Sequence, residues 1–279
     1  MFLVPDFKGF DFFPHGTRLN FMKFKDLCFF ASLAAMALSL ILIFTKGFNY
    51  GVDFTGGAMI EVRSTQGPAD IAALRSKISA LELGDVQIQS FGTPEDALIR
   101  IKEQPGGEEA QQEALKKVQG VLGEGYEQRR VEIVGPAVSS ELRRTGTIAV
   151  LVSIIAIMAY VWFRFEWQFA VGTLVALAHD VLVTAGIFSL FQLEFDLSIV
   201  AALLTILGYS VNDTVVVADR IRENLRKYKR MDLNELLNLS INETLSRTIL
   251  TGVTTIVVLI ALFFLGGAVI HNFTFAMLF

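Results

Sequence analysis

Long apolar runs separated by polar segments dominate the pattern of this chain. A helix of about 17–25 mostly apolar residues spans a bilayer, and five runs meet that length. They cover residues 27–44, 147–163, 169–191, 197–218 and 249–265. A sixth apolar run starts near Ala268 and is still apolar at Phe279, so we expect the sequence to stop inside a sixth span. The pattern predicts a polytopic α-helical membrane protein, a six-span bundle whose last span is truncated.

The segment between the first two spans has the periodicities of a small domain of strands and helices. Residues 58–63 alternate between apolar and polar positions, which is typical of a strand, and a helix follows between Pro68 and Gly84. Strands at 86–91 and 97–101 around a Gly-Thr-Pro-Glu-Asp turn, a helix at 108–122 and a strand at 130–134 complete it. The order βαββαβ predicts a two-layer, ferredoxin-like α+β domain.

This domain carries none of the residue patterns that enzymes use. It has no histidine and no cysteine, and its acidic residues fall at turns and on helix faces. The whole chain has one cysteine, Cys28, which excludes a disulfide framework and the usual zinc spacing. We expect a binding or docking domain in a protein that is not an enzyme, with no cofactor, no metal site and no nucleic-acid partner.

Composition and charge placement give the chain an orientation in a membrane. Hydrophobic residues make up 53% of the chain and charged residues only 19%. Lys and Arg precede the first span and follow the second and fourth, whereas the loop with Glu194 and Asp196 has neither. The positive-inside rule therefore places the N-terminus in the cytoplasm and that loop outside, together with the α+β domain.

These expectations divide the chain into four parts. A cytoplasmic N-terminal segment covers residues 1–26, and the first transmembrane helix covers 27–46. The external ferredoxin-like domain covers 47–144. Residues 145–279 contain transmembrane helices two to five and the start of the sixth, with a cytoplasmic loop at about 220–243.

Asp213 is a carboxylate in the fourth apolar run, where an ionised group costs about 2.5–3.5 kcal/mol. Such a residue indicates a functional site. At helical spacing it shares an arc with Thr205, Gly208, Tyr209 and Asn212, all small or polar. Because polar side chains bond across helix interfaces, we expect this arc to face the bundle.

Arg247 opens a matching polar stripe on the fifth run, followed by Thr251, Thr254 and Thr255. Arg247 lies four residues after Glu243, which is about 6 Å at helical rise. Asp213 lies six residues before Asp219, the first cytoplasmic charge after its span, which is about 9 Å. The two charges therefore occupy similar depths and are able to pair, which indicates a gated proton relay. The alternatives are that Arg247 only snorkels to the interface and that Asp213 is a structural partner.

His179 and Asp180 form a second intramembrane site, at the midpoint of the third run. Histidine titrates near neutral pH, so the pair is suited either to relay protons or to support the structure. Adjacent helical residues point about 100° apart, so the two need not act together. Ser210 with His179 would suggest an intramembrane serine protease, but the sequence offers no loop to stabilise an oxyanion, and we reject that function.

Four motifs together resemble one family. They are Tyr50-Gly-Val-Asp-Phe-Thr-Gly-Gly57, Gly208-Tyr-Ser-Val-Asn-Asp213, Asp219-Arg-Ile-Arg-Glu-Asn224 and Leu245-Ser-Arg247-Thr-Ile-Leu-Thr251. The chain is similar to SecF proteins of the SecD/SecF protein-export family, which resemble the resistance-nodulation-division transporters. The resemblance covers the chain from the first span to Phe279 and implies a bacterial inner-membrane protein with a periplasmic domain.

The resemblance also implies partners and residue roles. SecF acts with a SecD subunit beside the SecYEG-type protein-conducting channel, with YajC and YidC as further candidate partners, and assists a translocating unfolded polypeptide by using the proton gradient. Asp213 and Arg247 match residues of the proton pathway, and Thr251 matches a polar residue beside it. Asn212, His179 and Asp180 are expected to support it. The rival functions are a structural subunit without a proton role and half of a small-molecule or ion transporter.

Overall fold

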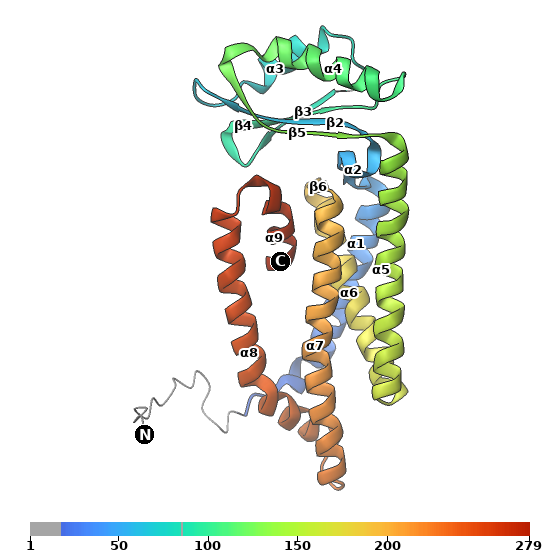
Figure 1. Cartoon of the computed structure of the whole chain (residues 1–279). Helices are drawn as coiled ribbons and strands as arrows, with labels where there is room; N and C mark the ends of the chain where they lie inside the picture. Colours follow the sequence, from blue (N-terminus) through green and yellow to red (C-terminus); the bar gives the residue numbers. More distant parts are fainter. Residues whose placement is uncertain (1–17, 85) are drawn as a thin grey trace, which may run out of the picture.

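The computed structural model describes residues 18–84 and 86–279, and residues 1–17 of the predicted N-terminal segment lie outside that range. Within these described residues, five helices are long and apolar enough to cross a membrane. Their bounds are Lys25–Lys46 for α1, Pro136–Arg164 for α5, Trp167–Phe191 for α6, Leu197–Lys227 for α7 and Leu233–Leu265 for α8. They form a bundle with a separate α/β domain over one end (Figure 1). The predicted multi-pass membrane fold is confirmed.

The helices extend beyond the apolar runs at the end of the bundle away from the α/β domain. Residues 220–243, expected as a loop, are helical except for a short turn between α7 and α8. Side-chain bonds between the two extensions hold them together, because Asn224 Nδ2 donates to Ser240 Oγ at 3.0 Å and to Glu243 Oε2 at 2.7 Å. Arg220 Nε also reaches Glu243 Oε2 at 2.7 Å. Hydropathy does not detect polar helices of this kind.

The start of the predicted sixth span is helical but short. A 3-10 turn, η3 at Ala268–Ile270, leads into α9 at His271–Leu278. Gly267, at φ +74°, lets the chain reverse after α8. The helix α9 runs back into the bundle and packs against both α7 and α8 (Figure 1).

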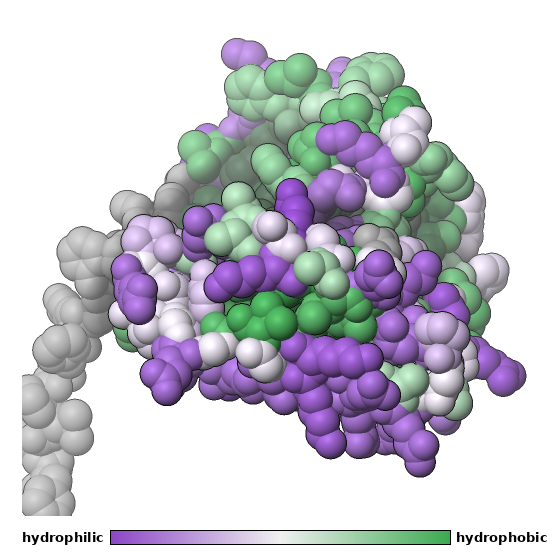
Figure 2. All heavy atoms as spheres, turned by 90° about the horizontal axis from the view of Figure 1, so that it is seen from above, coloured by the Kyte–Doolittle hydropathy of each residue, from purple (hydrophilic) through white to green (hydrophobic). Residues whose placement is uncertain are grey.

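The α/β domain has the predicted ferredoxin-like topology. Its sheet contains β2 (Gly57–Ser64), β3 (Val86–Phe91), β4 (Thr93–Ile101) and β5 (Tyr126–Val134) in the antiparallel order β3-β4-β2-β5. The helices α3 (Ile71–Ser79) and α4 (Gly107–Leu122) cover the outer face, and a short turn, η2 (Gly123–Gly125), precedes β5. Their apolar stripes and the inward strand residues, such as Ile60 and Ile99, form one buried core. From the domain end, the near surface is mostly hydrophilic, with a short apolar strip (Figure 2).

Several boundaries within the domain differ from the sequence expectation, and β5 begins at Tyr126 instead of Arg130. Thr93-Pro94-Glu95-Asp96, expected in a turn, opens β4 instead, because Gly92 at φ +73° makes the reversal tight. The domain ends at Val134 and α5 begins at Pro136, so the second membrane helix projects well past the membrane run that starts at Thr147. Proline at the first helical position is pre-set for a helix start and explains this early beginning.

The linker between α1 and the sheet is hydrogen-bonded to the loop between α6 and α7. This linker contains β1 (Asn49–Tyr50) and α2 (Val52–Thr55), and β1 pairs in parallel with β6 (Glu194–Phe195). Below it, α1 and α6 pack so closely that Ser39 lies directly against Gly186. At the opposite end, the short helix η1 (Phe21–Phe24) and the residues before it are bound by asparagines of α8, since Asn238 Oδ1 accepts from Met22 N at 3.0 Å.

Candidate functional site

Asp213 lies in an open groove between α6 and α7. The groove has a volume of about 420 Å³ and includes Phe169, Gly172 and Thr173 of α6. Asp213 comes three residues after Ser210, whose side chain bonds to α6. It comes four residues after Tyr209, whose side chain bonds to α8. It therefore occupies the strip of α7 between the faces that contact those two helices.

The polar arc of α7 does not turn into the bundle as expected. Thr205, Gly208, Tyr209 and Asn212 are exposed, and Asp213 is half-buried. Within the apolar run of this helix, residues 197–218, the buried positions are apolar, such as Leu203 and Leu207. Apolar contacts with α6 and α9 decide the rotation of α7, which leaves the polar arc open on this chain.

Asp213 and Arg247 do not form an ion pair within the part of the chain that the structure describes. Arg247 is exposed on α8, and Asp213 faces the groove beside α6. Similar depth in the membrane is therefore not enough to bring the two side chains together, because each helix also has a rotation about its own axis.

Tyr209 provides the contact between the polar arc and the threonine stripe. Its hydroxyl lies 2.8 Å from both Thr251 O and Thr255 Oγ1 on α8. The Thr251 hydroxyl itself donates within α8, to Arg247 O at 3.1 Å and Thr248 O at 3.0 Å. Arg247 and Thr251 are thus neighbours on one helix, joined to α7 one turn away from Asp213.

His179, Asp180 and Ser210 form a hydrogen-bonded chain across α6 and α7. His179 Nδ1 lies 3.0 Å from Asp180 Oδ1, and Ser210 Oγ donates to Asp180 Oδ2 at 2.7 Å. The adjacent histidine and aspartate therefore do interact. Because the carboxylate lies between the other two groups, His179 is not placed to deprotonate Ser210, and the geometry is not that of a serine protease.

Ser210 is a site residue that sequence reasoning missed in this role. Its spacing of three residues from Asp213 placed it near the same face of α7, which was the available signal. Thr214 Oγ1 donates to the Ser210 carbonyl at 3.0 Å, within α7. Because Ser210 and Asp213 are less than one turn apart, the network around Asp180 and the groove at Asp213 are adjacent along α7. The network is the nearer of the two to the α/β domain.

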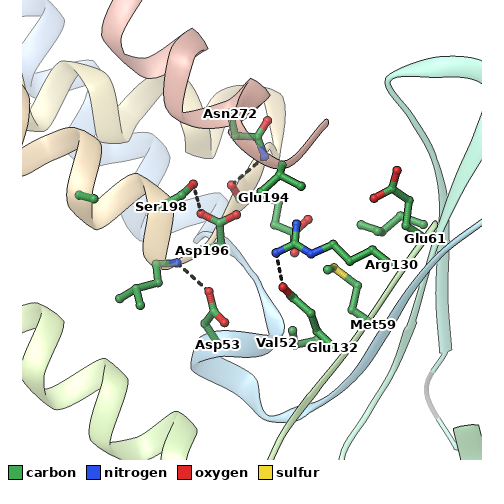
Figure 3. A pocket seen from close by; sticks show the side chains of 14 residues that line it. Val52, Asp53, Met59, Glu61, Arg130, Glu132, Glu194, Asp196, Ser198 and Asn272 are labelled. Carbon is green, nitrogen blue, oxygen red and sulfur yellow. Dashed lines mark hydrogen bonds and ion pairs between the residues drawn. The ribbon is translucent and has the colours of Figure 1, made fainter. Parts of the chain in front are cut away.

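A second polar cluster joins the α/β domain to the bundle, at a place where the sequence indicated only loop charges. A cavity of about 350 Å³ lies there between Glu61, Arg130 and Glu132 of the sheet and the loop before α7 (Figure 3). Asp53 Oδ2 accepts from Leu197 N at 2.9 Å.

Burial shapes the electrostatics of this cluster. It raises the pKa of Glu194, and neighbouring Asp196 and Asp53 raise it further, whereas Arg100 opposes them. Burial also raises the pKa of Asp196, against the hydrogen bonds from Ser198 and the Ile199 backbone.

A pair of glycines starts the sheet beside this cluster. Gly56 and Gly57 have φ of +73° and +112°, a region that residues with a side chain rarely adopt. A Cβ on Gly57 would lie 2.3 Å from the Ile101 carbonyl oxygen. Only glycine therefore lets the chain turn from α2 into β2 while β4 passes so close.

The family comparisons match the region that contains Asp213 and the region that contains the glycine pair. Residues 113–279 match the family described as protein export membrane protein SecD/SecF, C-terminal, and residues 41–68 match the SecD/SecF GG motif. The chain belongs to the SecD/SecF protein-export family. The resemblance predicted from its motifs is confirmed, and the glycine pair lies inside the matched GG motif.

Relatives and solved structures support the same assignment. The chain is 48% identical to protein translocase subunit SecF of Magnetococcus marinus, over 96% of this chain and 87% of that protein. It is 44% identical to the same subunit of Vibrio alginolyticus, over 93% and 83%. The SecDF crystal structure from Thermus thermophilus, described as a translocon-associated membrane protein, superposes with a TM-score of 0.85 at 38% identity. A SecDF structure in a super-membrane-facing form gives 0.66 at 40% identity. In each case the match covers 94% of this chain and 36% of the solved one.

Proposed function

We propose that this chain is the SecF subunit of a complex with a SecD-like subunit that uses the proton-motive force to assist protein translocation. One observation indicates that this chain needs a partner. The polar arc of α7 is open on this chain, although it lies at the depth of a membrane-spanning helix. Polar groups facing lipid are costly, so another polypeptide should cover this arc. The SecD part of a complex is the natural candidate, because the solved SecDF chains are much longer than the part that this chain matches.

Charge placement supports an orientation with the α/β domain in the periplasm. The basic residues of the α5–α6 and α7–α8 turns lie at the end of the bundle away from the domain, whereas β6 lies beneath the domain (Figure 1). The positive-inside rule puts the basic end in the cytoplasm. The chain would then be a bacterial inner-membrane protein, with its domain on the side where an exported polypeptide emerges from a SecYEG-type channel. YajC and YidC remain proposed partners on the family resemblance alone.

Asp213 is the proposed proton-binding group. It lies in a groove, close to the Ser210–Asp180–His179 chain on one side and to the Tyr209 contact with α8 on the other. Protonation removes its charge and so changes how α7 is held between α6, α8 and the partner. Arg247 is the proposed counter-charge, which a rotation of α7 or α8 would bring nearer in another state of the cycle.

The energy available matches a switch of this kind. Moving one charge across the membrane potential supplies about 2.3 kcal/mol per 100 mV. One or two protons per cycle therefore supply a few kcal/mol, enough to shift the populations of two packing states substantially. The α/β domain, attached to α1, α5 and the α6–α7 loop, would move with that packing and act on the exported chain.

The test is Asp213→Asn in cells that contain the SecD partner. We expect proton-dependent export to fall towards its level without the complex, while SecD still co-purifies with the variant. Normal export in D213N would refute the proton role. Loss of SecD from the purified complex would instead show that Asp213 acts as a structural contact, the rival function of a subunit without a proton role.

A further inference from the structure

The α/β domain is attached to the bundle at the linker after α1 and at the α6–α7 loop. On this side, β1 pairs with β6, and Gly51 N donates to Phe195 O at 2.9 Å. Phe195 packs among aromatic rings of the linker and of α6, which are Phe48, Tyr50, Phe54 and Phe188. The linker and the α6–α7 loop thus form one packed unit under the sheet.

The other side of the domain overhangs an open cleft. A cavity of about 700 Å³ separates the sheet, at Arg63 and Asp96, from the α8–α9 end of the bundle, at Phe264 and His271. The ion pairs on this underside, Arg63–Asp96, Arg129–Glu127 and Arg130–Glu132, all stay within the sheet.

Arg100 alone among the sheet residues that the structure describes forms an ion pair with the bundle. It comes from β4, where Ile99 and Ile101 point into the core and Arg100 points to the opposite face. Its Nη2 lies 2.7 Å from Glu194 Oε2, and the two side chains are 9% and 8% exposed. Such burial shields the pair from the water and salt that weaken surface ion pairs.

Asn49 extends this contact through the packed unit. Arg100 Nη1 donates to Asn49 Oδ1 at 2.9 Å, and Asn49 Nδ2 donates to the Gln192 carbonyl, also at 2.9 Å. Glu194 and Gln192 both belong to the loop between α6 and α7. One arginine therefore holds both the linker and that loop against the sheet.

We propose that Arg100 is a positioning residue that, through Glu194, couples the α/β domain to the α6–α7 loop. Movement of α6 and α7 then passes to the domain as a rigid displacement, because the pair stays closed. This proposal rests on the proposed function, in which proton binding at Asp213 supplies that movement. Removing either charge leaves the other buried without an oppositely charged partner, so the contact loosens.

Exchanging the two charges should preserve the contact. Glu194 lines one cavity together with Asp53 and Asp196, and both carboxylates raise its pKa in addition to the effect of burial. An arginine at position 194 would be attracted by these two carboxylates, and a glutamate at position 100 would face that arginine. A purely structural loss of packing would not be repaired in this way.

The test uses the complex with its SecD partner in lipid nanodiscs. The variants are Arg100→Gln, Glu194→Gln and the exchanged pair R100E/E194R. The control is Arg63→Gln, which removes an ion pair from the same sheet face but not from the interface. Hydrogen exchange is measured at the amides of Gly51 and Leu197, which bond across the linker and the loop. Protein export is measured in cells.

Both single variants should accelerate exchange at these two amides by about tenfold or more and lower export, and the exchanged pair should recover both. R63Q should change neither. If R100Q does not accumulate, Arg100→Lys keeps the charge but loses the planar two-partner geometry, and should give a smaller increase. Unchanged exchange in R100Q, or an exchanged pair as defective as the single variants, would overturn the proposal. Normal export in D213N would remove the proton role but leave this exchange result standing.

Discussion

Replacing Gly186 with alanine tests how tightly α1 is bound to α6. An added methyl carbon would lie 2.3 Å from Oγ, 2.5 Å from Cβ and 2.9 Å from Cα of Ser39. A rotation of the serine side chain moves its Oγ but neither carbon, so the helices themselves must separate. Non-bonded carbon atoms rest at about 3.5–4.0 Å, which requires a displacement of roughly 1 Å.

The expected cost follows from this overlap and from the bonds nearby. Overpacking of a well-packed contact costs about 1–3 kcal/mol. One turn nearer the α/β domain, Ser189 Oγ donates to Leu42 O at 3.0 Å and to Gly47 O at 2.8 Å. A displaced α1 also weakens these bonds, so we expect G186A to reach the upper part of that range.

The assay is thermal unfolding of the purified complex in nanodiscs. The matched control is Gly172→Ala on the same helix, where nothing lies within 4 Å of the added methyl group. We expect G186A to melt several degrees below G172A, and Ser39→Gly in the G186A background to recover part of the loss, because it removes Oγ and Cβ. Equal melting of the two alanine variants would refute the close α1–α6 contact.

Three further predictions concern the sheet, its entry and the α7–α8 contact. Gly57→Ala should disrupt the start of β2, because the new methyl group meets a backbone oxygen. The control is Gly67→Ala, where φ is also positive, at +108°, but nothing lies within 4 Å of the new methyl group. We expect a sharp loss of accumulated protein for G57A relative to G67A, and equal levels would contradict the prediction. The hydrogen bond from Arg63 lowers the pKa of Asp96, so this carboxylate stabilises the domain above its unfolded pKa of about 4 and stops doing so as pH falls through the lower folded value. Amide exchange in β2 and β4 should therefore accelerate on acidification, and Asp96→Asn should remove part of that pH dependence; an unchanged profile would contradict the assignment. Tyr209→Phe removes the hydroxyl that reaches Thr251 and Thr255 and should destabilise α7–α8 packing by about 0.6 kcal/mol, whereas Tyr160→Phe at an exposed position of α5 should not.

The architecture followed from the sequence because its signals are local. Apolar runs gave the five long helices, and alternation at residues 58–63 with two helical stripes gave the ferredoxin-like order. The polar ends of α7 and α8 were missed, because side-chain bonds such as Asn224–Ser240 hold them and not apolar burial. Depth along a helix was also predictable, as it depends only on residue count and rise.

The arrangement within the candidate site was less predictable, because rotation about a helix axis depends on packing. Asp213 and Arg247 were placed at similar depths, yet the apolar face of α7 turns Asp213 towards the groove beside α6. Ser210 and Asp180 come from separate helices, and no local pattern indicates that they bond. The same holds for Arg100 and Glu194, whose pairing depends on how the domain is placed over the bundle.

Proton flux through the purified SecF–SecD complex in liposomes tests the central claim most directly. The comparison is between the wild-type chain, Asp213→Asn and the control Asp219→Asn. The control removes an exposed carboxylate farther along the same helix, and this carboxylate pairs with Arg164. A proton gradient with a pH-sensitive dye inside the vesicles reports the flux. We predict that D213N abolishes the complex-dependent flux and that D219N retains it. Undiminished flux in D213N would contradict the account.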